Sequence, residues 1–239
     1  MRKIITLMII TLFFVGLLGL AIENSVSVNT DNDDLYVRTR GGPTNVSGLI
    51  TKDTTWTANN SPYIITGDTT LMTGNILTIH AGTIVKFKDN TKLTIRGFLY
   101  VLGNKSNRVI FTNEDPVKTT GINYHVDIDE LNGGLVNITY GKFEHSNYAY
   151  GALVLYHEAA NKNQSITDTE FIDNKVGLSR GDNKLIVKNC TFKYNYYGTE
   201  DFIGLIQDSV FYNNTVGAFS PEYYPIMYNC SFIKNEYGI

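Results

Sequence analysis

The chain contains few residues of several types whose abundance would point to a particular class of protein. Its 239 residues include 2 cysteines, 5 prolines and 1 tryptophan. Two cysteines cannot supply the dense disulfide framework on which small secreted domains depend. Lys and Arg number 20 against 23 Asp and Glu, so the basic stripe that nucleic-acid binding needs is missing. No His or Cys pair has a spacing typical of a metal site, and we expect neither a metal nor a cofactor.

Long apolar runs are also missing, except at the N-terminus. Arg2 and Lys3 precede a mostly apolar run from 4 to 22, in which Gly19 and Ala21 are small residues at cleavage-site spacing. This pattern predicts a signal peptide over 1–21 and a secreted or cell-surface protein. The alternative is an uncleaved anchor, which would be the chain's only contact with a membrane. Cleavage would change the formal net charge from −3 to −5.

Composition divides the remainder into three parts. Residues 22–47 are polar and predict a flexible spacer. Residues 48–115 predict an N-terminal cap and first coils, and 116–239 predict repeats that are truncated at 239. Candidate glycosylation sites, each beginning Asn-x-Ser/Thr and each expected at the surface, are Asn45, Asn59, Asn104 and Asn163.

A twelve-residue pattern recurs four times near the C-terminus. It reads aliphatic, x, Asp/Asn, small, x, Phe, x, x, Asn, x, x, Gly. Its phenylalanines are Phe171, Phe192, Phe211 and Phe232, so successive copies lie 21, 19 and 21 residues apart. A fixed period of this kind indicates stacked units that cannot bury their apolar faces alone.

The residue types select an all-β solenoid. Short alternating runs rich in Ile, Val, Tyr, Phe and Thr, broken by Asn and Gly, favour strands over helices. Leucine-rich repeats have this length, but their leucine ladders are missing. We therefore predict a parallel β-helix whose coils of three strands take 19–21 residues each, so that equivalent residues stack about 4.8 Å apart.

Besides an aliphatic stack of Ile166, Val187, Ile206 and Met227, three further stacks are expected inside this solenoid. The first is formed by Phe171, Phe192, Phe211 and Phe232. The second is a corner row in which each Asn takes left-handed dihedrals and hydrogen-bonds its neighbours, at Asn174, Asn195, Asn214 and Asn235. The third includes Cys190 and Cys230, which should lie two coils apart, roughly 9.6 Å at ~4.8 Å per coil. A disulfide needs Cα atoms within about 7 Å, so we expect two buried free thiols.

The repeat resembles that of right-handed parallel β-helix proteins, the pectate-lyase-like superfold of microbial surfaces and secretomes. The segment 187–198 carries this resemblance, and 77–87 and 93–99 resemble the opening coils of such proteins. The family contains polysaccharide lyases, hydrolases, epimerases and adhesins. The resemblance therefore implies fold and location more than chemistry.

An enzyme of this family would carry its site on the strand after each repeat Gly. Polar residues on or near that strand are Asn123, His125, Asp127, His157, Ser179, Arg180, Glu200, Asp201 and Glu222. They are scattered over several coils, and the clustered carboxylates of a lyase or hydrolase are missing. No catalytic constellation is predicted. Possible glycan contacts are Tyr197, Tyr223 and Tyr224, since exposed tyrosines can stack on sugar rings.

Taken together, these features predict a secreted or cell-surface β-helix with a structural or adhesive role. Its expected partners are polysaccharide or other cell-envelope components, with glycan binding included. End-on self-association is expected through an uncapped C-terminal coil. The alternative is the N-terminal fragment of a polysaccharide lyase or glycoside hydrolase whose catalytic coils lie beyond residue 239.

Overall fold

A computed structural model describes residues 42–115, 122–156, 162–221 and 225–239. Contacts divide the chain into Met1–Thr39 and Arg40–Ile239, and only the second unit is described below. The expected signal peptide and residues 22–41 of the expected spacer lie outside the described residues. So do His157, Glu222, Tyr223 and Tyr224.

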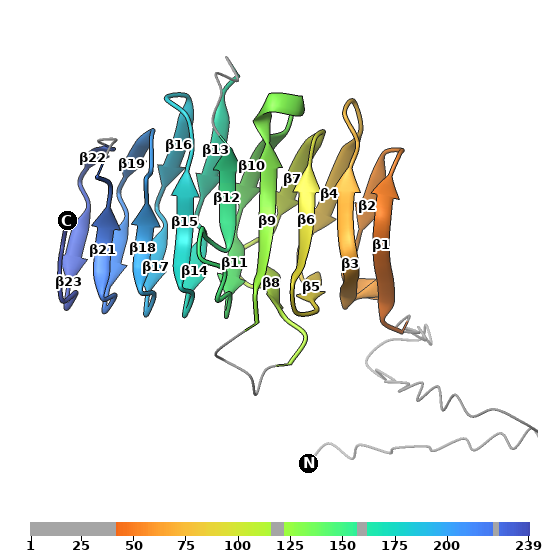
Figure 1. Ribbon diagram of the computed structural model, residues 1–239, viewed down its shortest axis with the longest axis horizontal. Helices are drawn as coiled ribbons and strands as arrows, with labels where there is room; N and C mark the ends of the chain where they lie inside the picture. Colours follow the sequence, from red (N-terminus) through yellow and green to blue (C-terminus); the bar gives the residue numbers. More distant parts are fainter. Residues whose placement is uncertain (1–41, 116–121, 157–161, 222–224) are drawn as a thin grey trace, which may run out of the picture. The chain divides into compact units, whose positions relative to one another are not determined.

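The described chain is all-β, and its strands form three rows that we call faces (Figure 1). The first face contains β1 (Thr44–Ile50), β3 (Tyr63–Leu71), β6 (Thr91–Ile95), β9 (Tyr124–Asp129), β12 (Leu153–Tyr156), β15 (Val176–Arg180), β18 (Tyr197–Glu200) and β21 (Val216–Phe219). The second contains β5 (Ile84–Phe87), β8 (Val109–Asn113), β11 (Gly141–Glu144), β14 (Glu170–Ile172), β17 (Thr191–Lys193), β20 (Val210–Tyr212) and β23 (Ser231–Ile233). The third contains β2 (Thr54–Trp56), β4 (Ile76–His80), β7 (Phe98–Leu102), β10 (Leu135–Thr139), β13 (Gln164–Thr167), β16 (Leu185–Lys188), β19 (Leu205–Gln207) and β22 (Ile226–Tyr228).

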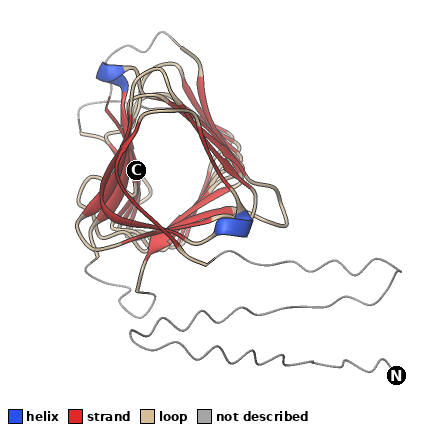
Figure 2. Ribbon diagram, turned by 90° about the vertical axis from the view of Figure 1, so that its right-hand side faces the viewer, coloured by secondary structure: helices blue, strands red, loops and turns tan. Residues whose placement is uncertain are grey.

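Every strand pairs in parallel with the equivalent strand of the neighbouring rung. The first and second faces form one 15-stranded sheet, and the third face is an 8-stranded sheet. Strand β3 joins the first two faces, because its residues Tyr63–Ile65 pair with β5 while Thr69–Leu71 pair with β6. Seen along the solenoid, the strands line three walls (Figure 2). This arrangement confirms the predicted all-β parallel solenoid.

Phenylalanines from the second face form a continuous stack through the core. Phe171, Phe192 and Phe211 are 0 % exposed, and the pairing registers place each directly over the next. Their ring centroids are 4.9 and 4.7 Å apart, with planes 3° and 8° from parallel. Phe232 extends the stack at 4.6 Å. Because each ring lies over the next in the same position, the core grows by repetition of one packing contact.

Left-handed residues occur at all three corners, including Arg180 with φ of 61° and Asp201 with φ of 48° between the first and third faces. Between the third and second faces, φ is 51° at Asp168 and 54° at Asn189. Between the second and first faces, the left-handed residue is the one before each repeat Asn, with φ of 53° at Asp173 and 59° at Tyr194. The expectation that Asn174 and its equivalents adopt left-handed dihedrals is therefore wrong. The preceding residue makes the turn, which leaves the Asn side chain free to point inward.

The buried Asn row links each rung to the next. The Oδ1 of Asn195 accepts hydrogen bonds from the backbone N–H and the Nδ2 of Asn174, at 3.0 and 3.1 Å. The Nδ2 of Asn195 donates to the carbonyl of Phe171 at 3.0 Å and to Oδ1 of Asn214 at 3.0 Å. The side chain thus satisfies backbone groups that the corner would otherwise leave unpaired inside the protein.

The repeat glycine is required by a close approach between rungs. A Cβ at Gly198 would lie 2.3 Å from the carbonyl oxygen of Gly217 and 2.9 Å from the ring of Phe211. Both distances are far below van der Waals contact, so no larger residue fits without moving the backbone. The glycine lets the stacked rings pass close to the start of the first-face strand.

The two cysteines are free, in line with their spacing along the solenoid. Ser209 occupies the equivalent position in the rung between them, and its Oγ accepts a hydrogen bond from the N–H of Cys190 at 3.1 Å. Cys190 is 1 % exposed, and burial raises the pKa of its thiol to about 12. Cys230 is only partly buried, contrary to expectation. It lies between β22 and β23, in a rung that has a described neighbour on one side only.

Candidate functional site

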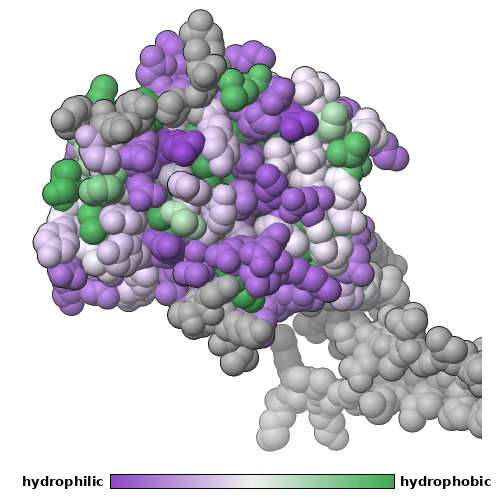
Figure 3. Space-filling view, in the orientation of Figure 1, coloured by the Kyte–Doolittle hydropathy of each residue, from purple (hydrophilic) through white to green (hydrophobic). Residues whose placement is uncertain are grey.

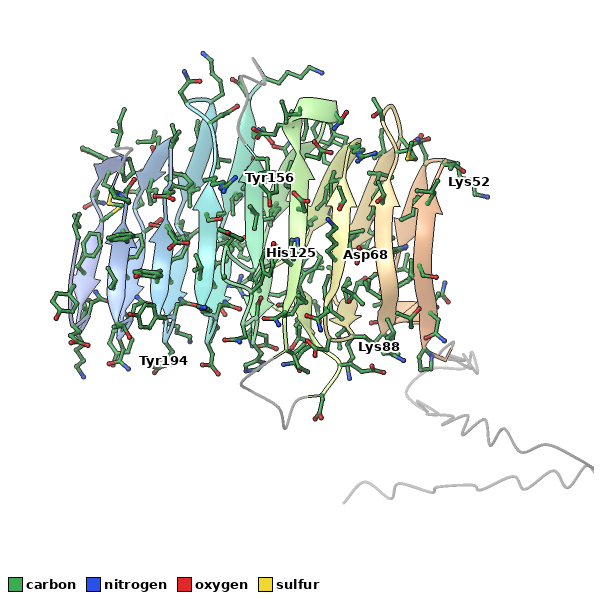
Figure 4. All side chains as sticks on the ribbon, in the orientation of Figure 1. Lys52, Asp68, Lys88, His125, Tyr156 and Tyr194 are labelled. Carbon is green, nitrogen blue, oxygen red and sulfur yellow. The ribbon has the colours of Figure 1, made fainter. Side chains whose placement is uncertain are left out.

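The first face brings several of the polar residues predicted from the sequence into register. The pairing places Thr94, Asp127, Val154, Ser179 and Glu200 in one column across successive strands. Figure 3 shows that this face presents mainly hydrophilic side chains, with separate apolar ones between them. His125 and Tyr156 lie on the same face in Figure 4. Asn123 precedes β9, where its N–H donates to Asp89 at 3.0 Å.

His125 is held under an aromatic ring. It points outward from β9, yet it is 8 % exposed because Tyr148 stacks on it with centroids 3.8 Å apart and planes 8° from parallel. Burial, helped by the positive charge of Lys92, lowers the pKa of His125 to about 4. The imidazole is therefore neutral at physiological pH, so it serves as a packing surface and hydrogen-bonding group rather than as a cation.

Asp127 is the most perturbed carboxyl of this face. It is 7 % exposed, and its Oδ1 has no hydrogen-bond partner. Burial raises its pKa to about 6. Lys92, Arg96 and Arg180 act in the opposite direction, because their positive charges favour the carboxylate. A carboxyl of this kind can change protonation state near neutral pH, which is a property of general acids and bases.

Arg180 is positioned by two tyrosines. Its guanidinium carbon lies 4.8 Å from the ring centroid of Tyr156 and 5.7 Å from that of Tyr150. The residue adopts a left-handed φ of 61°, which is uncommon for a long side chain and often marks functional positions. Ser179 beside it donates a short hydrogen bond to the carbonyl of Tyr150.

The segment between β11 and β12 therefore folds over the first face. It carries Tyr148 onto His125 and Tyr150 onto Arg180. Val154 points outward from β12 and is nevertheless 0 % exposed, as expected if this segment covers it. Sequence reasoning missed these tyrosines, because they belong to an irregular connection rather than to the repeat.

Paired-carboxylate chemistry does not fit this column. Asp127 and Glu200 are three strand spacings apart, or roughly 14 Å at ~4.8 Å each. The carboxyl pairs of retaining and inverting glycosidases are separated by about 5–9.5 Å. The cluster thus contains one titratable carboxyl, that of Asp127. Its neighbours are the guanidinium of Arg180 and the aromatic rings of Tyr148 and Tyr156.

A second cluster of carboxyls was also missed from the sequence. Glu130 is 5 % exposed; its Oε1 accepts from Gln164 at 2.5 Å and its Oε2 has no partner. Burial, helped by the nearby charge of Asp182, raises the pKa of Glu130 to about 7. Asp182 is 4 % exposed and accepts from the N–H of Lys184 at 2.7 Å. Glu130 lies 34 positions before Gln164 and Asp182 lies 18 positions after it, so no local motif joins these residues.

Tyr197, an expected glycan contact, is engaged in packing. Its ring stacks on Phe219 at 5.2 Å and meets Tyr196 edge-on at 4.7 Å. The expected glycosylation sites Asn45, Asn59, Asn104 and Asn163 are all exposed. The side chain of Asn104 is already used locally, since its Oδ1 accepts from the N–H groups of Ser106 and Asn107.

The described residues also bear on two other classes of site. Among the described residues, no three His, Cys, Asp or Glu side chains gather so as to hold a metal ion. The same part of the chain contains no helix that is long and apolar enough to span a membrane.

No protein-family model, curated protein or solved structure matches this chain.

Proposed function

We propose that this chain is a secreted or cell-surface protein with a structural or adhesive role that includes contact with glycans. In this proposal the solenoid is a right-handed parallel β-helix of the pectate-lyase-like type, with coils of 19–21 residues. Its partners are polysaccharide or other cell-envelope components. A further proposed partner is a second copy of the chain, which pairs end-on through the edges of β22 and β23. Sedimentation of the full chain at rising concentration tests this pairing, because a chain that stays monomeric throughout would contradict it.

One observation carries this proposal. From Phe171 to Asn235, the repeated polar and aromatic side chains stack on their own equivalents in the next rung. They are therefore used to extend the solenoid from rung to rung. A rigid rod with a polar surface suits a scaffold that holds or spaces other molecules.

The test combines location with binding. The gene, expressed in a secreting host, should yield protein in the medium or on the cell surface, with an N-terminus that begins near residue 22. The purified chain should then be retarded in native gels that contain a soluble polysaccharide. Protein that stays inside the cell with Met1 attached, and that no polysaccharide retards, would refute the proposal.

A second candidate is an enzyme that acts on extracellular polysaccharide. The observation in its favour is Asp127, a buried carboxyl with a raised pKa beside Arg180 and two tyrosines. Polysaccharide cleavage that vanishes in Asp127→Asn, while thermal stability is retained, would support the enzyme. Full activity in that variant, or no cleavage by the parent chain, would remove this candidate.

A further inference from the structure

A groove follows the outer side of the corner between the second and first faces. Its volume is about 530 Å³, and its walls include Asn147, Asp173, Lys175, Tyr194, Tyr196 and Thr215. It is separate from the cluster of Asp127 and Arg180, since none of those residues lines it. Figure 4 shows Tyr194 projecting from this margin of the solenoid.

The repeat itself produces the groove. In the rungs of Asn174, Asn195 and Asn214 the repeat Asn is buried and its amide bonds to a neighbouring rung. The row of Asn174 and Asn195 forms the floor of the groove. The residues on either side of each Asn point outward. In one rung both of these residues are aromatic, Tyr194 and Tyr196. The groove therefore runs along the solenoid axis and has its two rings at one level.

The two rings are partly exposed and well supported. Tyr194 is 49 % exposed and Tyr196 is 50 % exposed. Tyr194 meets the ring of Tyr212 edge-on at 6.0 Å, and Tyr196 meets that of Tyr197 edge-on at 4.7 Å. Rings fixed in this way offer apolar surface with little loss of side-chain freedom on binding.

The charges of the groove indicate which ligand suits it. Asp173 and Lys175 stand on the same rung on either side of Asn174, and their opposite charges offset one another. The remaining walls offer amide and hydroxyl groups. The lining residues carry no net charge, although the Nζ of Lys193 lies 5.9 Å from the ring centroid of Tyr194. Aromatic rings with neutral hydrogen-bonding groups match a polyhydroxylated chain better than an anionic one.

We propose that this groove binds a neutral, linear oligosaccharide that lies along the solenoid axis. The inference rests on the proposed adhesive function and specifies its site and ligand class. The lining comes from four rungs, which span roughly 14 Å at ~4.8 Å per rung, enough for a few sugar rings. One sugar ring stacks on Tyr194 or Tyr196, and its neighbours take hydrogen bonds from the rungs above and below.

The test measures binding of the full chain to neutral hexaoses of glucose, mannose and xylose, and to a hexamer of galacturonate. Tyr194→Ala and Tyr196→Ala should each weaken binding of a neutral hexaose about tenfold, through loss of a stacking surface. Tyr228→Ala is the matched control, because Tyr228 is 70 % exposed on the third face. Thr215→Trp fills the groove but leaves both rings in place, so it tests the same site without removing an aromatic ring.

The outcomes separate the groove from the proposed function. Binding of the neutral hexaoses could survive Tyr194→Ala, Tyr196→Ala and Thr215→Trp but be lost in Tyr156→Ala. This result would refute the groove as the binding site and leave the adhesive function intact. Preference for the galacturonate hexamer would overturn the ligand class. Failure of the parent chain to bind any of the four hexamers would overturn the groove as a saccharide site, whatever the location experiment finds.

Discussion

The regular repeats after residue 164 and the less regular chain before it use their polar side chains differently. From Phe171 onward the phenylalanines recur every 21, 19 and 21 residues, and the buried amides bond only to equivalent amides and backbone groups. Between Phe143 and Phe171 the spacing is 28, and the extra residues carry Tyr148 and Tyr150 across the first face.

This difference explains where titratable groups gather. A residue repeated in every rung is surrounded by copies of itself, so its environment is uniform and its bonds are structural. An irregular connection covers part of a face and removes water from the side chains beneath it. His125, Asp127 and Glu130 lie in the less regular part and have shifted pKa values. Burial also raises the pKa of Cys190 and Glu200 in the regular part, where Cys190 is held inside a repeated stack.

The largest effect should come from the regular core. Phe192→Ala removes a ring that is 0 % exposed and stacked on both sides, so we expect a loss of about 3–5 kcal/mol in unfolding free energy. Lys193→Ala, one residue further on the outer surface, should cost less than ~0.5 kcal/mol. Denaturant unfolding measures both values. Equal losses would mean that the ring stack does not carry the stability of the repeats.

The Asn row should give an intermediate effect. Asn195→Ala leaves buried backbone groups unpaired, including the carbonyl of Phe171, and we expect a loss of about 1–2 kcal/mol. Glu236→Ala changes an exposed residue directly after the repeat Asn235, and it serves as the control. Equal losses in the two variants would mean that the amide bonds between rungs contribute nothing to stability.

The remaining effect is a change in pH dependence. Since Glu130 has a folded-state pKa of about 7 against an ordinary value of 4.5, folding favours its protonated form. The stability that protonated Glu130 contributes to the folded state is fully present below pH 4.5 and is lost as pH rises through 7. Glu130→Gln should therefore remove part of the decline in stability over this window, as measured by denaturant unfolding at several pH values. Glu236→Gln, at an exposed glutamate, should leave the decline unchanged.

The sequence predicts the repeated features and not the unique ones. Phe192 and Asn195 could be assigned to stacks because each is seen four times in the same context, and a core position must satisfy the same constraint in every rung. The contact of Tyr148 with His125 has no second copy. It depends on the path of one connection across the first face, which residue types and spacing do not determine.

The corners between faces also show a feature that the sequence alone does not predict, namely which residue makes the turn. The Asn-x-x-Gly signature marks a turn, and Asn tolerates left-handed dihedrals, so the Asn was the natural choice for the bend. The bend instead falls on the preceding residue, which is Asp173, Tyr194, Asn213 or Lys234. Only the amide bonds to the neighbouring rungs explain this choice, and those bonds require the stacked structure.

The ring stack and Asn row also have a mechanical consequence. Each rung is joined only to its two neighbours, so tension applied to the C-terminus loads one rung at a time instead of the whole core. The chain should peel away in steps, each releasing one repeat of 19 or 21 residues, or roughly 7 nm of extended chain at ~3.4 Å per residue. A force–extension trace should be a sawtooth of nearly equal teeth in this region. A single large rupture would mean that the repeats yield together.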